Sequence, residues 1–293
     1  MRKKNHTPLY FITHGQKKYN MFTLNGRDTH SPSRVALIYN PDNNDHPSLF
    51  VSESEDSLYS LGTEYKPPED FLLMPCPSTV PNQRDCIYIA GPSGCGKSTY
   101  ITKYAGCHKR LYPKRNIYLI SSKATDKEID ACSSFITRIP RSEWSTHMGP
   151  KGLKDKRKRT APGTQFEYLP IEMYAKSLWI FDDCENDDMV SEIQAFRKRL
   201  IELGREQQVN VVVVSHMITN FNLTRNDIGE LTHVVIFPHK GVQNNNERFL
   251  KVYLKLSNVD IKRIYDDKTI THAITIKVDG TRAAICENKA WLL

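Results

Sequence analysis

The sequence lacks any long uninterrupted apolar stretch. No segment approaches the roughly 18 to 20 apolar residues that a membrane-spanning helix needs. The charged start, Met1-Arg2-Lys3-Lys4, leads into no apolar segment of the kind that a signal peptide carries. We therefore expect neither a membrane span nor a signal peptide.

Metal-type cysteine pairing is also missing. Seven cysteines are scattered over 293 residues, with no Cys-x-x-Cys and no histidine pair at zinc spacing. The odd count, together with the missing signal peptide, indicates a reducing compartment. The cysteines therefore point to no zinc site.

The composition that is present suits a folded enzyme with an anionic partner. Hydrophobic residues make up 39% of the chain and aromatic residues 10%, enough for a substantial core. The length fits one large domain, or one domain with a small appendage. Lys and Arg total 41 against 33 acids, a net charge of +8. Many soluble enzymes are this basic, but such a surface favours anions.

Two regions differ in pattern. Residues 1–80 are rich in Asn, Ser, Pro and Asp with short apolar islands, which predicts a small irregular β-containing appendage ending near Pro81. Residues 81–293 alternate buried-type strands with helical stretches, which predicts an α/β domain with a mostly parallel sheet and helices on both faces. The predicted strands are Cys86–Ala90, Asn116–Ser121, Leu178–Phe181, Val209–Ser215 and Thr232–Phe237.

Three further elements follow from local patterns. A helix is predicted over Asp187–Leu203, followed by Gly204 as its C-cap. Its apolar stripe consists of Met189, Ile193, Phe196, Leu200 and Leu203. In the tail, Phe249–Leu256 is predicted as a strand, and alternation over residues 274–278 up to Asp279-Gly280 predicts a hairpin.

A phosphate-binding loop is the clearest functional motif. The pattern Gly-x-x-x-x-Gly-Lys-Ser is met by Gly91, Gly96, Lys97 and Ser98, between a strand and a helix. Glycines let successive N–H groups face phosphate oxygens, and the helix adds its positive end. Lys97 would reach the β- and γ-phosphates, and Ser98 would ligate Mg²⁺. The loop that we expect to bind ATP comprises Gly91, Pro92, Ser93, Gly94, Cys95, Gly96, Lys97, Ser98 and Thr99.

A second motif is an apolar strand that ends in acids. Residues 177–183 read Ser-Leu-Trp-Ile-Phe-Asp-Asp. We assign Asp182 to the magnesium ion and Asp183 to the attacking water, with Glu185 as the alternative base. A solvated acidic turn is the other reading, since Asp187 and Asp188 continue the acidic run. The predicted strand Asn116–Ser121 suggests an extra strand inserted between the loop strand and the acidic strand.

Sensor and arginine candidates remain open from the sequence. Ser215 or His216, after the strand Val209–Val214, could touch the γ-phosphate or the water. Arg205 or Arg225 could act as an arginine finger on a neighbouring subunit's nucleotide. We expect Arg205, because it leads into the sensor strand and so should lie near the strand ends where nucleotides bind.

A basic cluster spans Lys151–Arg159, in a stretch bounded by glycine and proline. It is either a solvated loop or a contact to the backbone of nucleic acid. The same cluster could also resemble the arginine-rich lid of a kinase.

Together these motifs resemble a known family. The chain is similar to the genome-packaging ATPases of large double-stranded DNA viruses and virophages, the poxvirus-type branch of the FtsK–HerA superfamily of P-loop ATPases. The resemblance covers roughly residues 80 to 240. The matching segments are Ile87–Thr99, Trp179–Asp183, Gly204-Arg205 before Asn210–Val214, and Arg225-Asn226.

The resemblance implies a homo-oligomeric ring that hydrolyses ATP and pulls double-stranded DNA, without sequence preference, into a capsid. It implies capsid components as partners, and a location in the host cytoplasm, at the virus factory, or in the virion. The family usually carries a glutamine at the sensor position, where this chain has Ser215 or His216.

Other readings of the same motifs stay open. The phosphate loop also suits a nucleotide or nucleoside kinase, or a nucleotide-switched assembly module. A transporter ATPase should carry a Leu-Ser-Gly-Gly-Gln-type signature, which this sequence lacks. Asp182-Asp183 argues against a pure binding module, which needs no acid to orient water.

Overall fold

The computed structural model of the chain describes residues 10–14, 33–40, 48–52, 64–75, 77, 84–149, 167–218, 228–240, 243–270, 272–279 and 282–293. By contacts, the chain divides into two compact units, one of Asn82–Thr232 and one of Met1–Pro81 with His233–Leu293. The sequence-based division instead joins His233–Leu293 to the residues that follow Pro81. The two divisions differ because strands of the tail pair with a strand from the first 80 residues.

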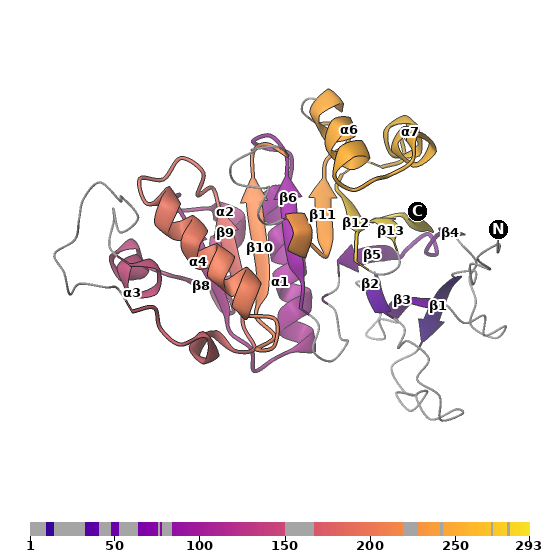
Figure 1. Cartoon of the computed structure of the whole chain (residues 1–293). Helices are drawn as coiled ribbons and strands as arrows, with labels where there is room; N and C mark the ends of the chain where they lie inside the picture. The colour runs from indigo at the N-terminus through magenta and orange to yellow at the C-terminus, as the bar shows by residue number, and fades with distance from the viewer. Residues whose placement is uncertain are drawn as a thin grey trace, which may run out of the picture. The chain divides into compact units, whose positions relative to one another are not determined.

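The unit Asn82–Thr232 is built on a parallel sheet of five strands (Figure 1). In spatial order these are β6 (Cys86–Ala90), β10 (Asn210–Ser215), β9 (Leu178–Asp182), β7 (Ile117–Ser121) and β8 (Thr137–Arg138). Almost every residue of β6, β9 and β10 is fully buried, which explains why these strands read as continuous apolar runs. The predicted parallel sheet is confirmed for this unit.

The identity of the inserted strand was predicted wrongly. A strand does lie between the loop strand β6 and the acidic strand β9, but it is β10, while β7 pairs with the outer side of β9. The order of the strands along the chain does not give their order in the sheet, because strands that are distant in sequence pair with each other.

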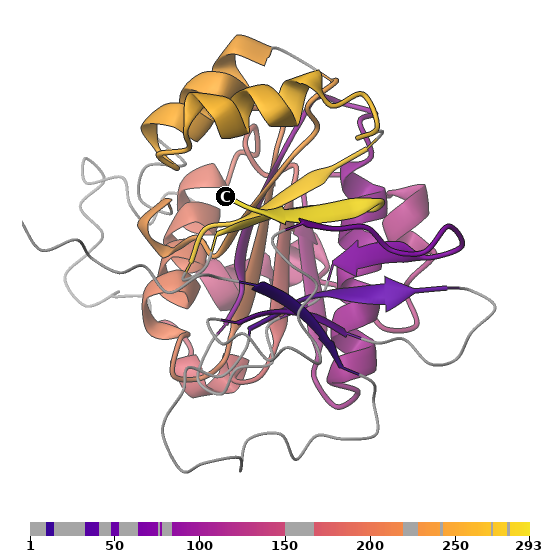
Figure 2. The same cartoon turned by 90° about the vertical axis from the view of Figure 1, so that its right-hand side faces the viewer.

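Helices cover both faces of this sheet. They are α1 (Lys97–Leu111), α2 (Lys127–Asp130), α3 (Trp144–Met148) and α4 (Val190–Leu203). The steps β6–α1–β7 and β9–α4–β10 run in opposite directions across the sheet, so right-handed crossovers place α1 and α4 on opposite faces. Figure 2 shows α1 and α4 on either side of the strands.

The helix α4 packs its predicted stripe on the sheet, with one exception. Ile193, Phe196 and Leu200 are buried, and the Phe196 ring lies edge-on to Trp179, 5.2 Å away. Leu203 was predicted in this stripe but is 53% exposed, at the last residue of the helix. A Cβ atom at Gly204 would lie 2.3 Å from the Leu200 carbonyl oxygen, so this C-cap position has room only for glycine.

The second unit contains two sheets. One has the order β1 (Tyr10–His14), β3 (Ser48–Ser52), β2 (Ser33–Tyr39) and β5 (Leu72–Pro75). The other runs through β4 (Glu64–Tyr65), β14 (Lys289–Leu292), β13 (Ala283–Cys286), β12 (Ile274–Lys277) and β11 (His233–Ile236), all antiparallel. Ile38, Leu49, Leu73 and Ile285 share one apolar core, which joins the tail to the first strands.

The tail differs from one of its two predictions. Residues 249–256 were predicted as a strand, which is wrong, because helix α6 (Gln243–Val252) contains their first half. The Tyr253 and Leu254 N–H groups both donate to the Phe249 carbonyl, at 2.9 and 3.3 Å, so this part of the predicted strand forms the end of the helix. A second helix, α7 (Asn258–Asp266), follows.

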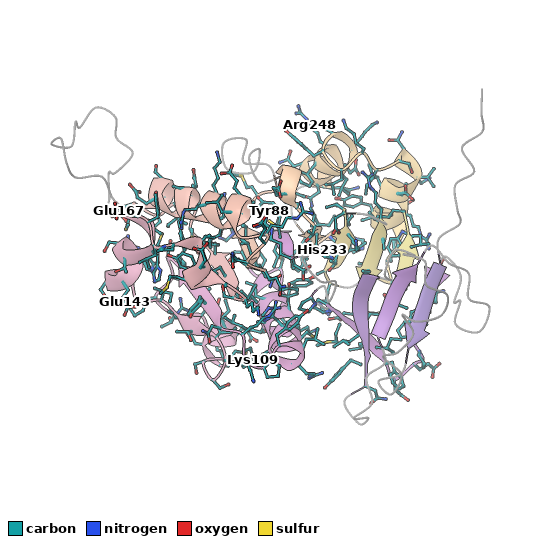
Figure 3. All side chains as sticks on the ribbon, turned by 60° about the horizontal axis from the view of Figure 1, so that its bottom comes forward. Tyr88, Lys109, Glu143, Glu167, His233 and Arg248 are labelled. Carbon is teal, nitrogen blue, oxygen red and sulfur yellow. The ribbon has the colours of Figure 1, made fainter. Side chains whose placement is uncertain are left out.

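The predicted hairpin is seen as the antiparallel pair β12 and β13, in which Lys277 lies opposite Ala283. Gly280, in its turn, lies outside the described residues. Figure 3 draws the side chains of both units. Among the described residues, no helix has both the length and the apolar character that crossing a membrane requires.

Candidate functional site

The phosphate loop joins β6 to α1 with the backbone that its glycines permit. Gly94 and Gly96 have φ angles of 73° and 107°, in the left-handed region that other residues avoid. Among the described residues, no atom lies within 4 Å of the place where a Gly94 side chain would begin, so they leave the loop open on this side. The Gly91 N–H donates to the Ser215 carbonyl at 3.2 Å, which ties the loop to the end of β10.

Lys97 lies at the mouth of this loop. Its ammonium donates to the carbonyl oxygens of Gly91 and Pro92, at 2.6 and 2.9 Å. Burial lowers the pKa of Lys97, and the nearby carboxylate of Asp182 counteracts this. The lysine is therefore held among the loop carbonyls, near the acids at the end of β9.

Asp182 is the buried acid at the end of β9. It is 3% exposed and accepts a hydrogen bond from the Ser121 hydroxyl at 3.3 Å. Burial raises the pKa of Asp182, and the charges of Asp183 and Asp126 add to this. A divalent cation beside this carboxylate would stabilise its charged form.

Asp183 follows in a backbone conformation with φ at 53°, in the left-handed region. Its two carboxylate oxygens are engaged by different partners: Lys123 Nζ lies 3.0 Å from Oδ2, and His216 Nε2 lies 2.9 Å from Oδ1. Burial alone would raise the pKa of Asp183, but these hydrogen bonds outweigh it and hold the pKa below its ordinary value. The carboxylate is thus held in its charged form between Lys123 and His216.

His216 connects the two motifs. Its Nδ1 lies 3.4 Å from Lys97 Nζ, and its Nε2 faces Asp183. An ammonium can only donate, so Nδ1 accepts from Lys97 and the Nε2–H donates to Asp183. Of the two sensor candidates, His216 is the one that lies between the loop lysine and the acid.

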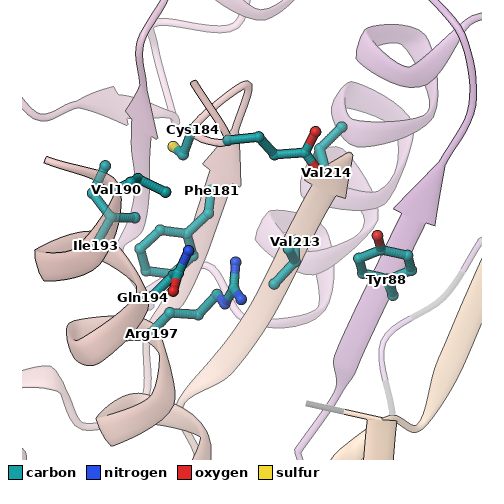
Figure 4. Close-up of a pocket in the computed structure, with 10 residues that line it drawn as sticks. Tyr88, Phe181, Cys184, Val190, Ile193, Gln194, Arg197, Val213 and Val214 are labelled. Carbon is teal, nitrogen blue, oxygen red and sulfur yellow. The ribbon is translucent and has the colours of Figure 1, made fainter. Parts of the chain in front are cut away.

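Ser215 and Glu185 form a separate pair. The Ser215 hydroxyl donates to Glu185, and Glu185 lines a small cavity beneath α4. Figure 4 shows that Phe181 of β9, Val213 of β10 and Ile193 of α4 surround this space. The described contacts therefore place Asp183, and not Glu185, beside His216 and Lys97.

The sequence analysis missed two residues of the candidate site. Both follow the carboxyl end of β7: Lys123 pairs with Asp183, and Asp126 Oδ2 accepts a hydrogen bond from the Ser98 hydroxyl at 2.9 Å. The sequence could have indicated both residues, because they follow a buried strand and the carboxyl ends of parallel strands meet at one edge of the sheet.

Asp187 is one of the acids that made the second motif ambiguous. Its contacts hold the start of α4 and do not reach the phosphate loop among the described residues. It accepts a hydrogen bond from the Met189 N–H at 2.8 Å, at the start of α4. It also pairs with Arg141 at 2.7 Å. The acidic run therefore divides between Asp182 and Asp183 at the site and Asp187 at the helix.

Arg205 does not lie where we expected. It is in the turn that precedes β10, while the phosphate loop and the acids follow the carboxyl ends of the strands. A six-residue strand such as β10 spans about 20 Å, so Arg205 is at the opposite edge of its own sheet. Arg225 and the cluster Lys151–Arg159 lie outside the described residues.

Comparison with known proteins finds a similar viral sequence and several similar solved structures. No family model matches the chain. A stretch of 199 residues is 27% identical to the uncharacterized protein V3 of Sputnik virophage, covering 66% of this chain and 71% of that protein.

Similar solved structures include the genome packaging NTPase B204 from Sulfolobus turreted icosahedral virus 2 in complex with AMPPCP. It is 14% identical over 67% of this chain and 93% of that chain, with a TM-score of 0.41. The conjugation coupling protein TcpA of pCW3, solved with ATPgS, is 11% identical over 89% of this chain and 77% of that chain, also with a TM-score of 0.41. At these scores the likeness assigns no activity to this chain. A virophage protein is thus among the sequences similar to this chain.

Proposed function

We propose that this protein is an ATP-hydrolysing motor that packages viral double-stranded DNA into capsids. The observation that carries the ATPase part is the chain of contacts from Lys97 through His216 to Asp183. It brings a phosphate-binding lysine and a water-orienting acid into one site. The packaging part is supported by the sequence resemblance and by the virophage relative.

The residues present fit ATP and Mg²⁺. The open, glycine-rich loop offers backbone N–H groups to phosphates, and the buried carboxylate of Asp182 lies next to the same site. When bound, ATP would supply the labile terminal phosphoryl group, and Mg²⁺ would neutralise the negative charge that develops on it. Lys97 would bind the phosphate oxygens, Ser98 and Asp182 would hold the metal ion, and Asp183 would orient the attacking water.

The decisive test of function is the effect of DNA. We predict that double-stranded DNA of any sequence binds and speeds ATP hydrolysis, because packaging must accept every sequence and so contacts phosphates. If four cations of the cluster Lys151–Arg159 touch phosphates, the slope of log K against log salt should be about −3.6 per subunit. The measurements are DNA affinity across a salt series and ATPase rate with and without DNA.

The matched variant neutralises Lys156, Arg157, Lys158 and Arg159 together. We expect a flatter salt slope, loss of DNA stimulation and unchanged basal ATPase. Unchanged DNA affinity in this variant would show that the cluster is only a solvated loop. A wild-type protein that hydrolyses ATP but ignores DNA at low salt would contradict the packaging function and favour the kinase or switch readings.

We further propose that Arg205 acts on the nucleotide of a neighbouring subunit in a homo-oligomeric ring. Its place at the far edge of its own sheet leaves it no route to the nucleotide in the same chain. Arg205→Ala and Lys97→Ala proteins should each be inactive alone and regain some activity when mixed, since some interfaces would then pair an intact loop with an intact arginine. ATPase rates of mixtures, with assembly checked by particle mass, test this. Confirmed assembly without recovery would contradict the role in trans.

A further inference from the structure

The turn between β7 and α2 brings a second lysine to the nucleotide site. Lys123 Nζ is paired with Asp183 Oδ2 at 3.0 Å and also faces the carboxylates of Asp182 and Asp126. Asp183 also accepts from His216, whose Nδ1 lies 3.4 Å from Lys97 Nζ, so both ammonium groups belong to one site. Two like charges that converge in this way favour an anion between them.

The backbone of this turn is anchored. Arg138 donates to the Lys123 carbonyl at 2.8 Å and pairs with Asp130 at 2.6 Å. Asp126 caps α2 by accepting from the Glu128 and Ile129 N–H groups, both at 3.1 Å. The position from which Lys123 extends is therefore fixed.

The side chain of Lys123 is less constrained than its backbone. It is 43% exposed, and its ammonium sits at the end of a flexible four-carbon stem. Lysine binds phosphate as a point charge, without the fixed fork of arginine, so it can exchange one anionic partner for another at little geometric cost.

We propose that Lys123 responds to the terminal phosphate of ATP by changing partners. One partner is Asp183, the contact that this structure shows. With ATP bound, Lys123 moves to the γ-phosphate, and Asp183 Oδ2 is released to accept a hydrogen bond from the attacking water. The exchange is driven by charge, because a terminal phosphate carries more negative charge than one carboxylate. This inference rests on the proposed ATPase function and adds a residue that distinguishes ATP from ADP.

The test compares affinities for two nucleotides in the presence of Mg²⁺. Dissociation constants for ADP and for a non-hydrolysable ATP analogue are measured with the wild type, Lys123→Ala, Lys123→Arg and Lys127→Ala. Lys127 is an exposed lysine at the start of α2, and its removal changes the charge of the same turn equally. We expect Lys123→Ala to lose about tenfold in analogue affinity while ADP affinity changes less than about twofold. Lys123→Arg should keep part of the preference, and Lys127→Ala should keep all of it.

Two results would contradict the role of Lys123 without contradicting the proposed ATPase function. One is an unchanged ratio of ADP to analogue affinity in Lys123→Ala, and the other is an equal loss for both nucleotides, as expected of a structural lysine. A wild-type protein that binds neither nucleotide would overturn the proposed function as well, and the wild-type measurement separates these cases. Steady-state turnover gives a second readout: Lys123→Ala should also lower kcat, whereas a lysine that only restrains Asp183 would raise kcat when removed.

Discussion

Replacing Lys97 with alanine should abolish ATP hydrolysis and weaken nucleotide binding. The ammonium lies at the mouth of the loop, within 2.6 Å of the Gly91 carbonyl oxygen and 3.4 Å of His216 Nδ1. Its contacts to phosphate would be charge-assisted, so their loss should cost about 1.5–3 kcal/mol in binding. That corresponds to roughly a 10- to 150-fold weaker affinity.

The loss in rate should exceed the loss in binding. Negative charge builds up on the transferred group in the transition state, and removing one preorganised donor at such a position typically costs about 10²- to 10³-fold in kcat. Affinity by calorimetry and steady-state turnover separate the two effects. Lys109→Ala, near the far end of the same helix, is the control for loss of a lysine from α1 and should behave as wild type. Turnover near the wild-type level in Lys97→Ala would contradict the assignment of the loop.

The sequence was sufficient to predict those parts of the candidate site that depend on a local pattern. The loop from Gly91 to Thr99 and the acids after β9 each sit in one short segment, so residue type and spacing define them. The strands β6, β9 and β10 were also predictable, because burial on both faces demands continuous apolar residues.

The rest depends on contacts between distant segments. No spacing rule brings Lys123 to Asp183, because that pairing needs β7 to lie directly beside β9. The choice between Ser215 and His216 depends on which side chain faces the loop at the strand end, and only the backbone geometry decides this. The strand predicted over Phe249–Leu256 was wrong because a short apolar stretch fits the end of an amphipathic helix as well as a strand.

Replacing Asp183 with asparagine should leave ATP bound and stop its turnover. Asparagine has nearly the same shape and tolerates the left-handed backbone at φ 53°, where alanine would be strained. It keeps an oxygen that can accept from His216 but loses the negative charge that pairs with Lys123. In the proposed function, this charge orients and deprotonates the attacking water. Removing a general base typically costs about 10²- to 10⁴-fold in rate, whereas affinity for ATP should change little.

The neighbouring acids provide the matched comparisons. Asp182→Asn should also slow turnover, but its defect should appear as a raised magnesium requirement, because Asp182 is the buried carboxylate assigned to the metal ion. Glu185→Gln should retain most activity, since Glu185 contacts Ser215 at the cavity beneath α4. Steady-state rates of the three variants over a magnesium series, with nucleotide affinity measured in parallel, distinguish these roles. If Glu185→Gln alone stopped hydrolysis while Asp183→Asn did not, the base would be Glu185, and the contacts among Lys97, His216 and Asp183 would serve only to position the loop.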